Sequence, residues 1–376
     1  MPLIIAIDFS MHDNLSLAYG FYRYGIDLIN GISKIETGNR FVVIGSQPKP
    51  PLEIAHIFID NKLNWEYVCF QRRKKKLGHF RDQWSFYKMI AKYRPKLIHC
   101  LGNFIPFIVP CPVVATFHDL YEETLKGKGG GGGLYINFIK LFGKWKLAKF
   151  IASSNQTAID LNKYWKIKRK AIKTIHLGTS FERKYISFSE RQSDVIIARF
   201  NLFPGKNMPA LLVALSIVDK AGYCPKLVLF GKADVGLESE KEFDELAKNL
   251  GLQERIIKTG FLSDSELIKL YDTATMLVVP SLTEGFGLPL IEAMSRALPV
   301  VTNRYGATAE VVGDGGVLVD VKDPADLANG IINLLANPLE QQRIGKSGFC
   351  RSKYFTSDQM ALNTFNLYMN IIGDSN

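Results

Sequence analysis

Two carboxylates, Glu284 and Glu292, stand eight residues apart in the segment Pro280–Pro299 (PSLTEGFGLPLIEAMSRALP). The apolar residues before this segment predict a buried parallel strand, and the glycines after Glu284 predict a turn that leads into a helix from Leu288. Such a turn directs backbone N–H groups and the positive end of a helix dipole at a ligand, and phosphate is their natural partner. We expect Glu284 in the turn and Glu292 in the first helical turn. This arrangement suits a sugar nucleotide, although an ordinary helix start has a similar composition.

Two cations upstream could hold the phosphates of such a ligand. In Val195–Asn207 an apolar strand leads into Arg199, and Lys206 follows at the predicted start of a helix. Two fixed cations in a water-poor site can stabilise the charge that develops on a diphosphate leaving group without a metal. The segment is not a P-loop, because Gly205 and Lys206 lack the upstream glycine and the following Ser or Thr. A solvated basic face is the alternative interpretation.

Polar residues also follow predicted strands in the other half of the chain. Val113–Leu120 predicts a strand that ends at His118 and Asp119, and open parallel sheets bind ligands at the carboxyl ends of their strands. A structural histidine or a helix cap would have the same pattern. Near the N-terminus, Gly20 follows the strand expected at Leu3–Asp8 and opens a helix.

Two more strand–loop–helix units are expected between these cations and carboxylates. They begin at Leu227–Gly231 and at Ile256–Glu266, and Ser263 with Glu266 fits a capping box. The alternative interpretation is that these units are simple βαβ connections without a role in binding.

Taken in order, these segments resemble the retaining glycosyltransferases of family 4, whose E-x7-E signature matches Glu284 and Glu292. The resemblance covers essentially the whole chain and is strongest over residues 195–320. It implies transfer of a hexosyl unit, with GDP-mannose slightly favoured, from a nucleoside diphosphate sugar to a hydroxyl of a glycan or lipid-linked acceptor. It also implies retention at the anomeric carbon and no metal or other cofactor. A nucleotide-sugar 2-epimerase of the same fold and a non-catalytic basic binding protein are the alternatives.

The resemblance assigns a role to each matching residue. Glu284 would orient the donor sugar, His118 and Asp119 would act on it from the other domain, and Glu292 would hold the ribose. The implied donor-binding set is completed by Arg199, Lys206, Gly231, Phe261, Leu262, Gly285, Phe286, Gly287 and Leu288. Gly20 would lie on the acceptor side, where Phe21 and Tyr22 replace the small residues that are common in the family.

The length of 376 residues is enough for two domains with separate cores. Apolar strands that alternate with helical segments predict parallel sheets covered on both faces. We therefore predict an α/β protein of two Rossmann-like domains, the GT-B architecture, with a cleft between them. The acceptor-binding domain is expected over 1–180 and the donor-binding domain over 181–355. A C-terminal helix within 356–376 is expected to cross back to the first domain.

The two halves of the chain differ in charge. Residues 1–187 carry a net charge of +16 and residues 188–376 one of −5. Basic residues concentrate in Gln71–Lys76, Lys140–Lys149 and Lys163–Lys173, and the last two include Trp145 and Trp165. These segments predict binding to an anionic membrane surface, with acidic glycan, nucleic acid or a plain solvated face as alternatives. With the family context, membrane is favoured and no nucleic-acid partner is expected.

No segment is predicted to cross a membrane, because the longest apolar stretch, Phe104–Phe117, is short and contains three prolines. The N-terminus is expected to be a strand, not a signal peptide. Five cysteines without a C-x-x-C pair indicate a reduced cytosolic setting, and six scattered histidines predict no zinc site. A peripheral location on the inner face of the cell membrane follows. The five glycines at Gly129–Gly133 indicate an engineered loop or a natural flexible one.

Overall fold

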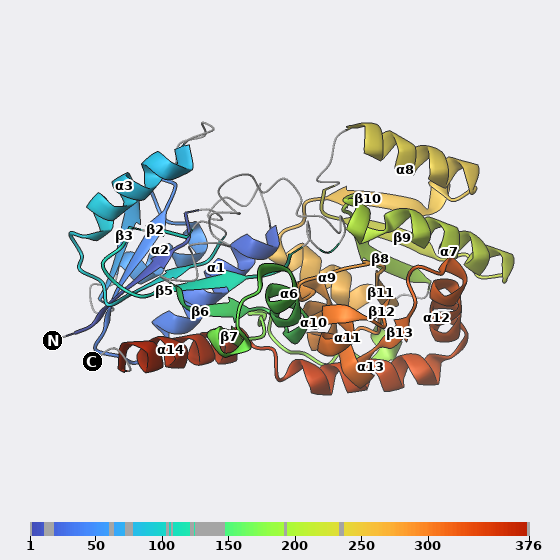
Figure 1. The fold of residues 1–376 in the computed structure, drawn as a ribbon. Helices are drawn as coiled ribbons and strands as arrows, with labels where there is room; N and C mark the ends of the chain where they lie inside the picture. Colours follow the sequence, from blue (N-terminus) through green and yellow to red (C-terminus); the bar gives the residue numbers. More distant parts are fainter. Residues whose placement is uncertain are drawn as a thin grey trace. The chain divides into compact units, whose positions relative to one another are not determined.

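In the computed structural model the chain divides into two α/β units (Figure 1). One comprises Met1–Ser180 with Thr356–Asn376, and the other Phe181–Phe355. The structure describes residues 2–10, 19–59, 64–71, 78–102, 105–106, 108–120, 124, 147–191, 194–232 and 237–373. Gly129–Gly133, Trp145 and all but the first residue of Gln71–Lys76 lie outside this part of the chain.

The described strands of the first unit form one parallel sheet in the order β3-β2-β1-β4-β5-β6-β7. The strands are β1 (Ile4–Asp8), β2 (Arg40–Gly45), β3 (Trp65–Cys69), β4 (Leu97–Cys100), β5 (Val113–Phe117), β6 (Leu147–Ala152) and β7 (Ile172–Thr174). The central strands are apolar because helices cover both faces of a parallel sheet. The described helices are α1 (Tyr19–Ser33), α2 (Leu52–Ile59), α3 (Gly78–Ile90), α6 (Asn155–Trp165) and α14 (Ser357–Gly373).

Helix α14, dark red in Figure 1, belongs to the first unit although it follows the second unit in sequence. It packs on α1, where a Cβ on Gly31 would overlap the side chain of Ala361. Thr179 pairs with Thr356, and the Ser357 N–H donates to the Thr179 carbonyl at 3.1 Å. The outgoing and returning segments of the chain therefore lie side by side in this unit.

The second unit contains a parallel sheet in the order β10-β9-β8-β11-β12-β13 within its described residues. Its strands are β8 (Val195–Arg199), β9 (Lys226–Phe230), β10 (Ile256–Gly260), β11 (Met276–Val279), β12 (Val300–Asn303) and β13 (Val317–Val319). Its helices are α7 (Met208–Lys220), α8 (Leu237–Asn249), α9 (Asp264–Thr273), α10 (Leu288–Ser295), α11 (Gly306–Val312), α12 (Pro324–Ala336) and α13 (Pro338–Ser352). Two buried apolar clusters, one built around α7 and α12 and the other around α9 and α10, pack on the strands.

Both sheets have the strand order of a Rossmann fold, in which the order reverses beside the first strand. The predicted fold class of two Rossmann-like α/β domains is confirmed. Ligands of such sheets bind outside the carboxyl ends of the strands at this reversal. In the second unit the reversal lies between β8 and β11, which are directly paired.

Three local predictions need correction. The helix expected from Lys206 is interrupted, because a 3₁₀ turn (Pro204–Lys206) precedes α7 and Asn207 between them is left-handed, with φ of 55°. The apolar residues of Thr174–Leu177 predict the last strand of the first domain, but β7 spans Ile172–Thr174 instead. Trp165 is only 9% exposed and packs edge-on against Phe117, so it is not available for insertion into a membrane.

Candidate functional site

The carboxyl ends of β8 and β11 bring the predicted cations and the first predicted carboxylate to one edge of the second sheet. Arg199 is the last residue of β8, and Glu284 lies in the turn that follows β11. The Leu282 N–H donates to the Gly205 carbonyl at 2.8 Å and joins this turn to the loop that carries Lys206. These residues therefore lie at the point where a Rossmann sheet binds its ligand.

Glu284 and Lys206 form an ion pair in this turn. The Lys206 Nζ lies 2.7 Å from Glu284 Oε1, and the Ser281 hydroxyl donates to the same oxygen at 2.8 Å. Burial acts to raise the pKa of Glu284, but the charge and hydrogen bond of Lys206, the Ser281 hydroxyl and the charge of Arg199 together hold it below its ordinary value. Glu284 is therefore an ionised carboxylate between two cations. We call these three residues the Arg199–Lys206–Glu284 cluster.

The glycine turn and the start of α10 follow this cluster. Gly287 caps the helix with φ of 100°, and a Cβ there would lie 2.8 Å from Leu290 Cδ1, so glycine is required. Phe286 is 3% exposed and packs edge-on against Phe355, and Leu288 is 8% exposed. Phe286 and Leu288 thus serve packing through their side chains, and residues 285–288 can offer a ligand mainly their backbone.

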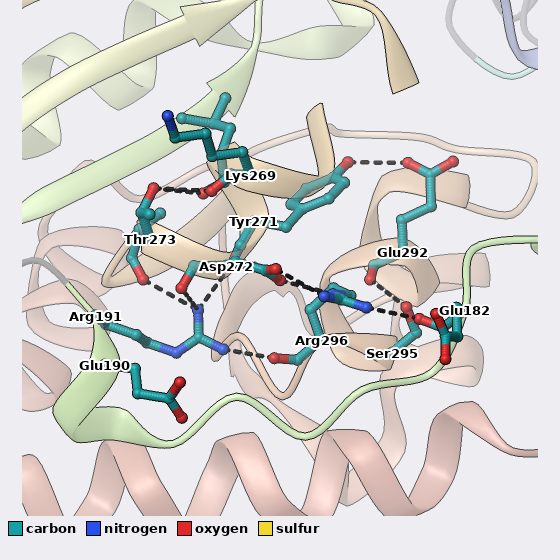
Figure 2. A network of polar contacts seen from close by, with 12 residues as sticks. Glu182, Glu190, Arg191, Lys269, Tyr271, Asp272, Thr273, Glu292, Ser295 and Arg296 are labelled. Carbon is teal, nitrogen blue, oxygen red and sulfur yellow. Dashed lines mark hydrogen bonds and ion pairs between the residues drawn. The ribbon is translucent and has the colours of Figure 1, made fainter. Parts of the chain in front are cut away.

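Glu292 does not lie where the sequence predicted. It is the fifth residue of α10, so it belongs to the second helical turn, and no acidic residue occupies the first. The residue is 2% exposed, and its Oε2 accepts a hydrogen bond of 2.9 Å from the Tyr271 hydroxyl (Figure 2). One turn further along, the side chain faces α9 instead of standing at the helix start.

The loops after β9 and β10 hold the remaining predicted donor residues. Gly231 follows β9 with φ of 93°, and its N–H donates to the Gly260 carbonyl at 2.7 Å. Phe261 is 44% exposed, whereas Leu262 packs on the apolar cluster around α9. The predicted capping box of Ser263 and Glu266 is present.

The predicted residues of the first unit gather around α1 and the end of β5. The ring of His118 packs edge-on against Phe21, with centroids 4.7 Å apart, and against Tyr24, at 4.6 Å. Asp119 is exposed, and Gly20 has open space where a Cβ would point. Phe21, which replaces a small residue common in the family, thus helps to hold His118.

The sequence did not predict a row of buried, hydrogen-bonded polar side chains next to His118. The Tyr24 hydroxyl and Thr116 Oγ1 are 2.9 Å apart, Thr116 Oγ1 and His99 Nε2 are 2.7 Å apart, and His99 Nδ1 and the Tyr368 hydroxyl are 2.5 Å apart. Burial lowers the pKa of His99 to about 3, so its imidazole is neutral. A histidine within the otherwise apolar run of β4 was the available signal.

Gly20, His118 and Asp119 belong to the first unit and the other predicted site residues to the second. No group of three or more metal-ligating side chains occurs among the residues that the structure describes. Within the same residues, no helix has the length and apolar character required to cross a membrane.

Comparison with known proteins bears on what this site binds. The family description "Glycosyl transferases group 1" matches residues 182–350, and "Glycosyltransferase Family 4" matches residues 23–183. The MMP alpha-(1->4)-mannosyltransferase of Mycolicibacterium hassiacum is 36% identical over 136 residues, which are 35% of this chain and 33% of that protein. The O-antigen chain mannosyltransferase B of Escherichia coli is 35% identical over 109 residues, 29% of each chain. The matches thus span a third or less of the length of these two relatives.

Among solved structures, HepE of Anabaena in complex with UDP and glucose is similar over 98% of this chain and 100% of its own, with a TM-score of 0.76 and 18% identity. This likeness shows the fold. The two family matches together span residues 23–350 and meet where the first unit gives way to the second. The chain therefore belongs to the group 1 glycosyltransferases of family 4 and has the GT-B fold, as its motifs indicated.

Proposed function

We propose that this protein is a retaining hexosyltransferase that moves a hexosyl unit from a nucleoside diphosphate sugar to a hydroxyl of a glycan or lipid-linked acceptor. The observation that carries the proposal is the Arg199–Lys206–Glu284 cluster at the strand-order reversal, directly before the glycine turn of α10. A mannosyl donor is supported by the names of the two relatives, and the second of these names also supports a role in polysaccharide assembly.

The cluster can serve the reaction in two ways. Arg199 and Lys206 are cations that can neutralise the charge developing on the leaving diphosphate, and the backbone N–H groups at the start of α10 add to this field. Fixed charges of this kind can replace a metal. Glu284, kept ionised by Lys206, can accept hydrogen bonds from sugar hydroxyls and orient the donor. His118 is proposed to meet the sugar from the first unit.

Binding of the donor provides the first test. We expect UDP, GDP or ADP, or a corresponding sugar nucleotide, to raise the thermal unfolding temperature of the wild-type protein. The Lys206→Ala variant should lose most of this shift. Lys322→Ala, which removes an exposed lysine near the start of α12, is the matched control and should keep it. If no nucleotide shifts the wild type, the proposed function is wrong.

Product analysis separates transfer from the other chemistry open to this fold. With donor and an added glycan or lipid-linked acceptor, we expect release of nucleoside diphosphate and a glycosylated product with the anomeric configuration of the donor. Accumulation of an epimerised sugar nucleotide without acceptor would instead identify a 2-epimerase. Inversion at the anomeric carbon would contradict the retaining assignment.

We further propose that the first unit binds an anionic membrane surface on the cytoplasmic side. The outer face of α3 supports this proposal: Trp84 is 52% exposed, stacks on Tyr87 with centroids 5.5 Å apart, and has the Lys88 Nζ 6.0 Å from its ring. Arg81 is exposed on the same helix. Aromatic rings beside basic side chains suit the interface, where each basic residue contributes about 1 kcal/mol. Exposed basic side chains in the segment 163–173 extend the positive surface of this unit.

Sedimentation with vesicles tests this membrane proposal. The double variant Trp84→Ala with Lys88→Ala should sediment less with phosphatidylserine vesicles than the wild type, and added salt should weaken both. Tyr354 with Lys353, 4.9 Å from its ring, is an equivalent exposed pair in the second unit, and its alanine variant should sediment like the wild type. If both variants sediment with the vesicles like the wild type, this face of α3 is only a solvated surface.

A further inference from the structure

Tyr271 is held from several sides within the second unit. It lies on α9, is 0% exposed, and donates its hydroxyl to Glu292 Oε2 at 2.9 Å. Its ring packs edge-on against Phe230, with centroids 6.0 Å apart, and against Phe181, at 6.4 Å. Phe230 ends β9 directly before Gly231. The ring therefore has little freedom to rotate, and the position of the hydroxyl is set by its neighbours.

The backbone at the end of α9 is fixed by Arg191. Its Nη1 donates to the carbonyls of Tyr271, Asp272 and Ala274 at 2.7, 3.2 and 3.3 Å, and its Nη2 to the Arg296 carbonyl at 2.5 Å (Figure 2). Carbonyls at helix ends lack partners within the helix, and a cation there also opposes the negative end of the dipole. Burial lowers the pKa of Arg191 to about 10, so it stays charged at neutral pH.

The hydrogen bond between Tyr271 and Glu292 is one link between α9 and α10, and an ion pair forms a second link beside it. Arg296 Nε and Nη2 donate to the two carboxylate oxygens of Asp272 at 2.6 and 2.7 Å, and its Nη1 donates to the Glu182 carbonyl at 2.8 Å. Asp272 follows Tyr271 in sequence, and Arg296 lies four residues after Glu292. Two adjacent links thus prevent α10 from sliding or turning relative to α9, and Figure 2 shows both.

We propose that Tyr271 is a positioning residue that orients the Glu292 carboxylate toward the ribose of the bound nucleotide, an inference that rests on the proposed function. A carboxylate offers two oxygens and about four lone pairs, so one bond to Tyr271 leaves acceptors for the neighbouring ribose hydroxyls. Because Glu292 is 2% exposed, water competes little for its carboxylate, and the tyrosine hydroxyl sets its direction. Without that hydroxyl the carboxylate is buried with one partner fewer and can turn away from the sugar.

The Tyr271→Phe variant tests this role, since it removes one oxygen and keeps the packed ring. Isothermal titration with UDP, GDP and ADP and with their 2′-deoxy counterparts is the measurement. The wild type should prefer the ribose form of whichever nucleotide binds. Tyr271→Phe should weaken that binding about 10-fold, or about 1.4 kcal/mol, and leave the 2′-deoxy form within about twofold. The donor KM should rise correspondingly with little change in kcat.

Four further variants make the outcome specific. Glu292→Gln should lose the same ribose preference, and Tyr271→Phe added to it should cost nothing more. Phe181→Leu, which keeps the hydroxyl but loosens the ring, should reduce the preference to a smaller extent and serves if Tyr271→Phe does not fold. Tyr223→Phe, at a half-buried tyrosine after α7, is the matched control and should bind like the wild type.

The possible failures can be told apart. The inference is overturned if Tyr271→Phe and Phe181→Leu both keep the ribose preference of the wild type. It is also overturned if Tyr271→Phe weakens the binding of the ribose and 2′-deoxy nucleotides equally, because Tyr271 would then have a purely structural role. If the wild type itself binds none of UDP, GDP and ADP in either form, the proposed function fails together with the inference.

Discussion

The buried imidazole of His99 should make the stability of the first unit depend on pH. Its two nitrogens lie against the hydroxyls of Thr116 and Tyr368, and the residue is 0% exposed. Burial lowers its pKa to about 3 from an ordinary value of 6.5. The flanking tyrosines, Tyr24 and Tyr368, have pKa values raised above 10.0 by burial, so among these four residues only His99 has an ordinary pKa near neutral pH.

The size of the effect follows from the two pKa values. Between pH 6.5 and pH 3 the unfolded chain binds a proton at this imidazole and the folded protein does not, so stability falls as the pH is lowered through this range. At 1.36 kcal/mol per pKa unit, moving from pH 7 to pH 5 should cost about 2 kcal/mol of unfolding free energy, and the limit near pH 3 is about 5 kcal/mol.

Urea unfolding of the wild type and of His99→Gln at both pH values is the assay. Gln cannot titrate, so the loss of unfolding free energy from pH 7 to pH 5 should be about 2 kcal/mol smaller in the variant, whatever its stability at pH 7. His56→Gln is the matched control, because it replaces an exposed histidine on α2 and leaves His99 in place, so it should lose as much free energy as the wild type. Where the two units unfold separately, only the transition of the first should respond.

The same pH dependence of stability in the wild type and in His99→Gln would refute the role given to His99. If His99→Gln and the wild type lose the same free energy between pH 7 and pH 5, within about 0.5 kcal/mol, then His99 is protonated in the folded protein or its site admits water. A loss in His56→Gln as small as that in His99→Gln would contradict the assignment in the same way.

The Arg199–Lys206–Glu284 cluster yields three further predictions. Arg199→Ala and Lys206→Ala should each lower the turnover rate, because each loses about 2.7–4 kcal/mol of transition-state stabilisation. Lys322→Ala is the control. Steady-state rates of Arg199→Ala and Lys206→Ala within a few-fold of the wild type would contradict the role of these cations. Transfer should persist in excess EDTA, because fixed cations face the diphosphate; complete loss that Mg²⁺ or Mn²⁺ restores would show a metal requirement. Since the pKa of Glu284 lies below its ordinary value of 4.5, its ionised form stabilises the fold above that pH, and this contribution disappears as the pH falls through the lowered pKa. The stability difference between the wild type and Glu284→Gln should therefore be largest near neutral pH and shrink in acid, and a pH-independent difference in urea unfolding would refute the ion-pair assignment.

Much of the architecture could be predicted from the sequence because it depends on neighbours within a few residues. Buried parallel strands are visible as apolar runs, and the capping box of Ser263 and Glu266 is a spacing of three residues. The glycine turn after Glu284 has the same local character. Strand ends of a parallel sheet meet at one edge, so the positions of Arg199 and Glu284 after apolar runs are enough to predict that they lie near one another.

The contacts that give these residues their properties were decided by tertiary packing. Lys206 and Glu284 are 78 residues apart in sequence, and their ion pair exists because β8 and β11 are paired. The helix of Glu292 begins one turn before it, and only the packing of α9 on α10 places its carboxylate against Tyr271.

The same limit applies to residues that the sequence marked wrongly or not at all. Trp165 lies in a lysine-rich segment that predicted membrane contact, but α6 turns it onto the sheet. His99 carried no motif, yet Tyr368, 269 residues away on α14, reaches it because the C-terminal helix packs in the first unit. Periodicity and spacing report only local order, whereas burial, ion pairing and pKa depend on which distant elements the fold brings into contact.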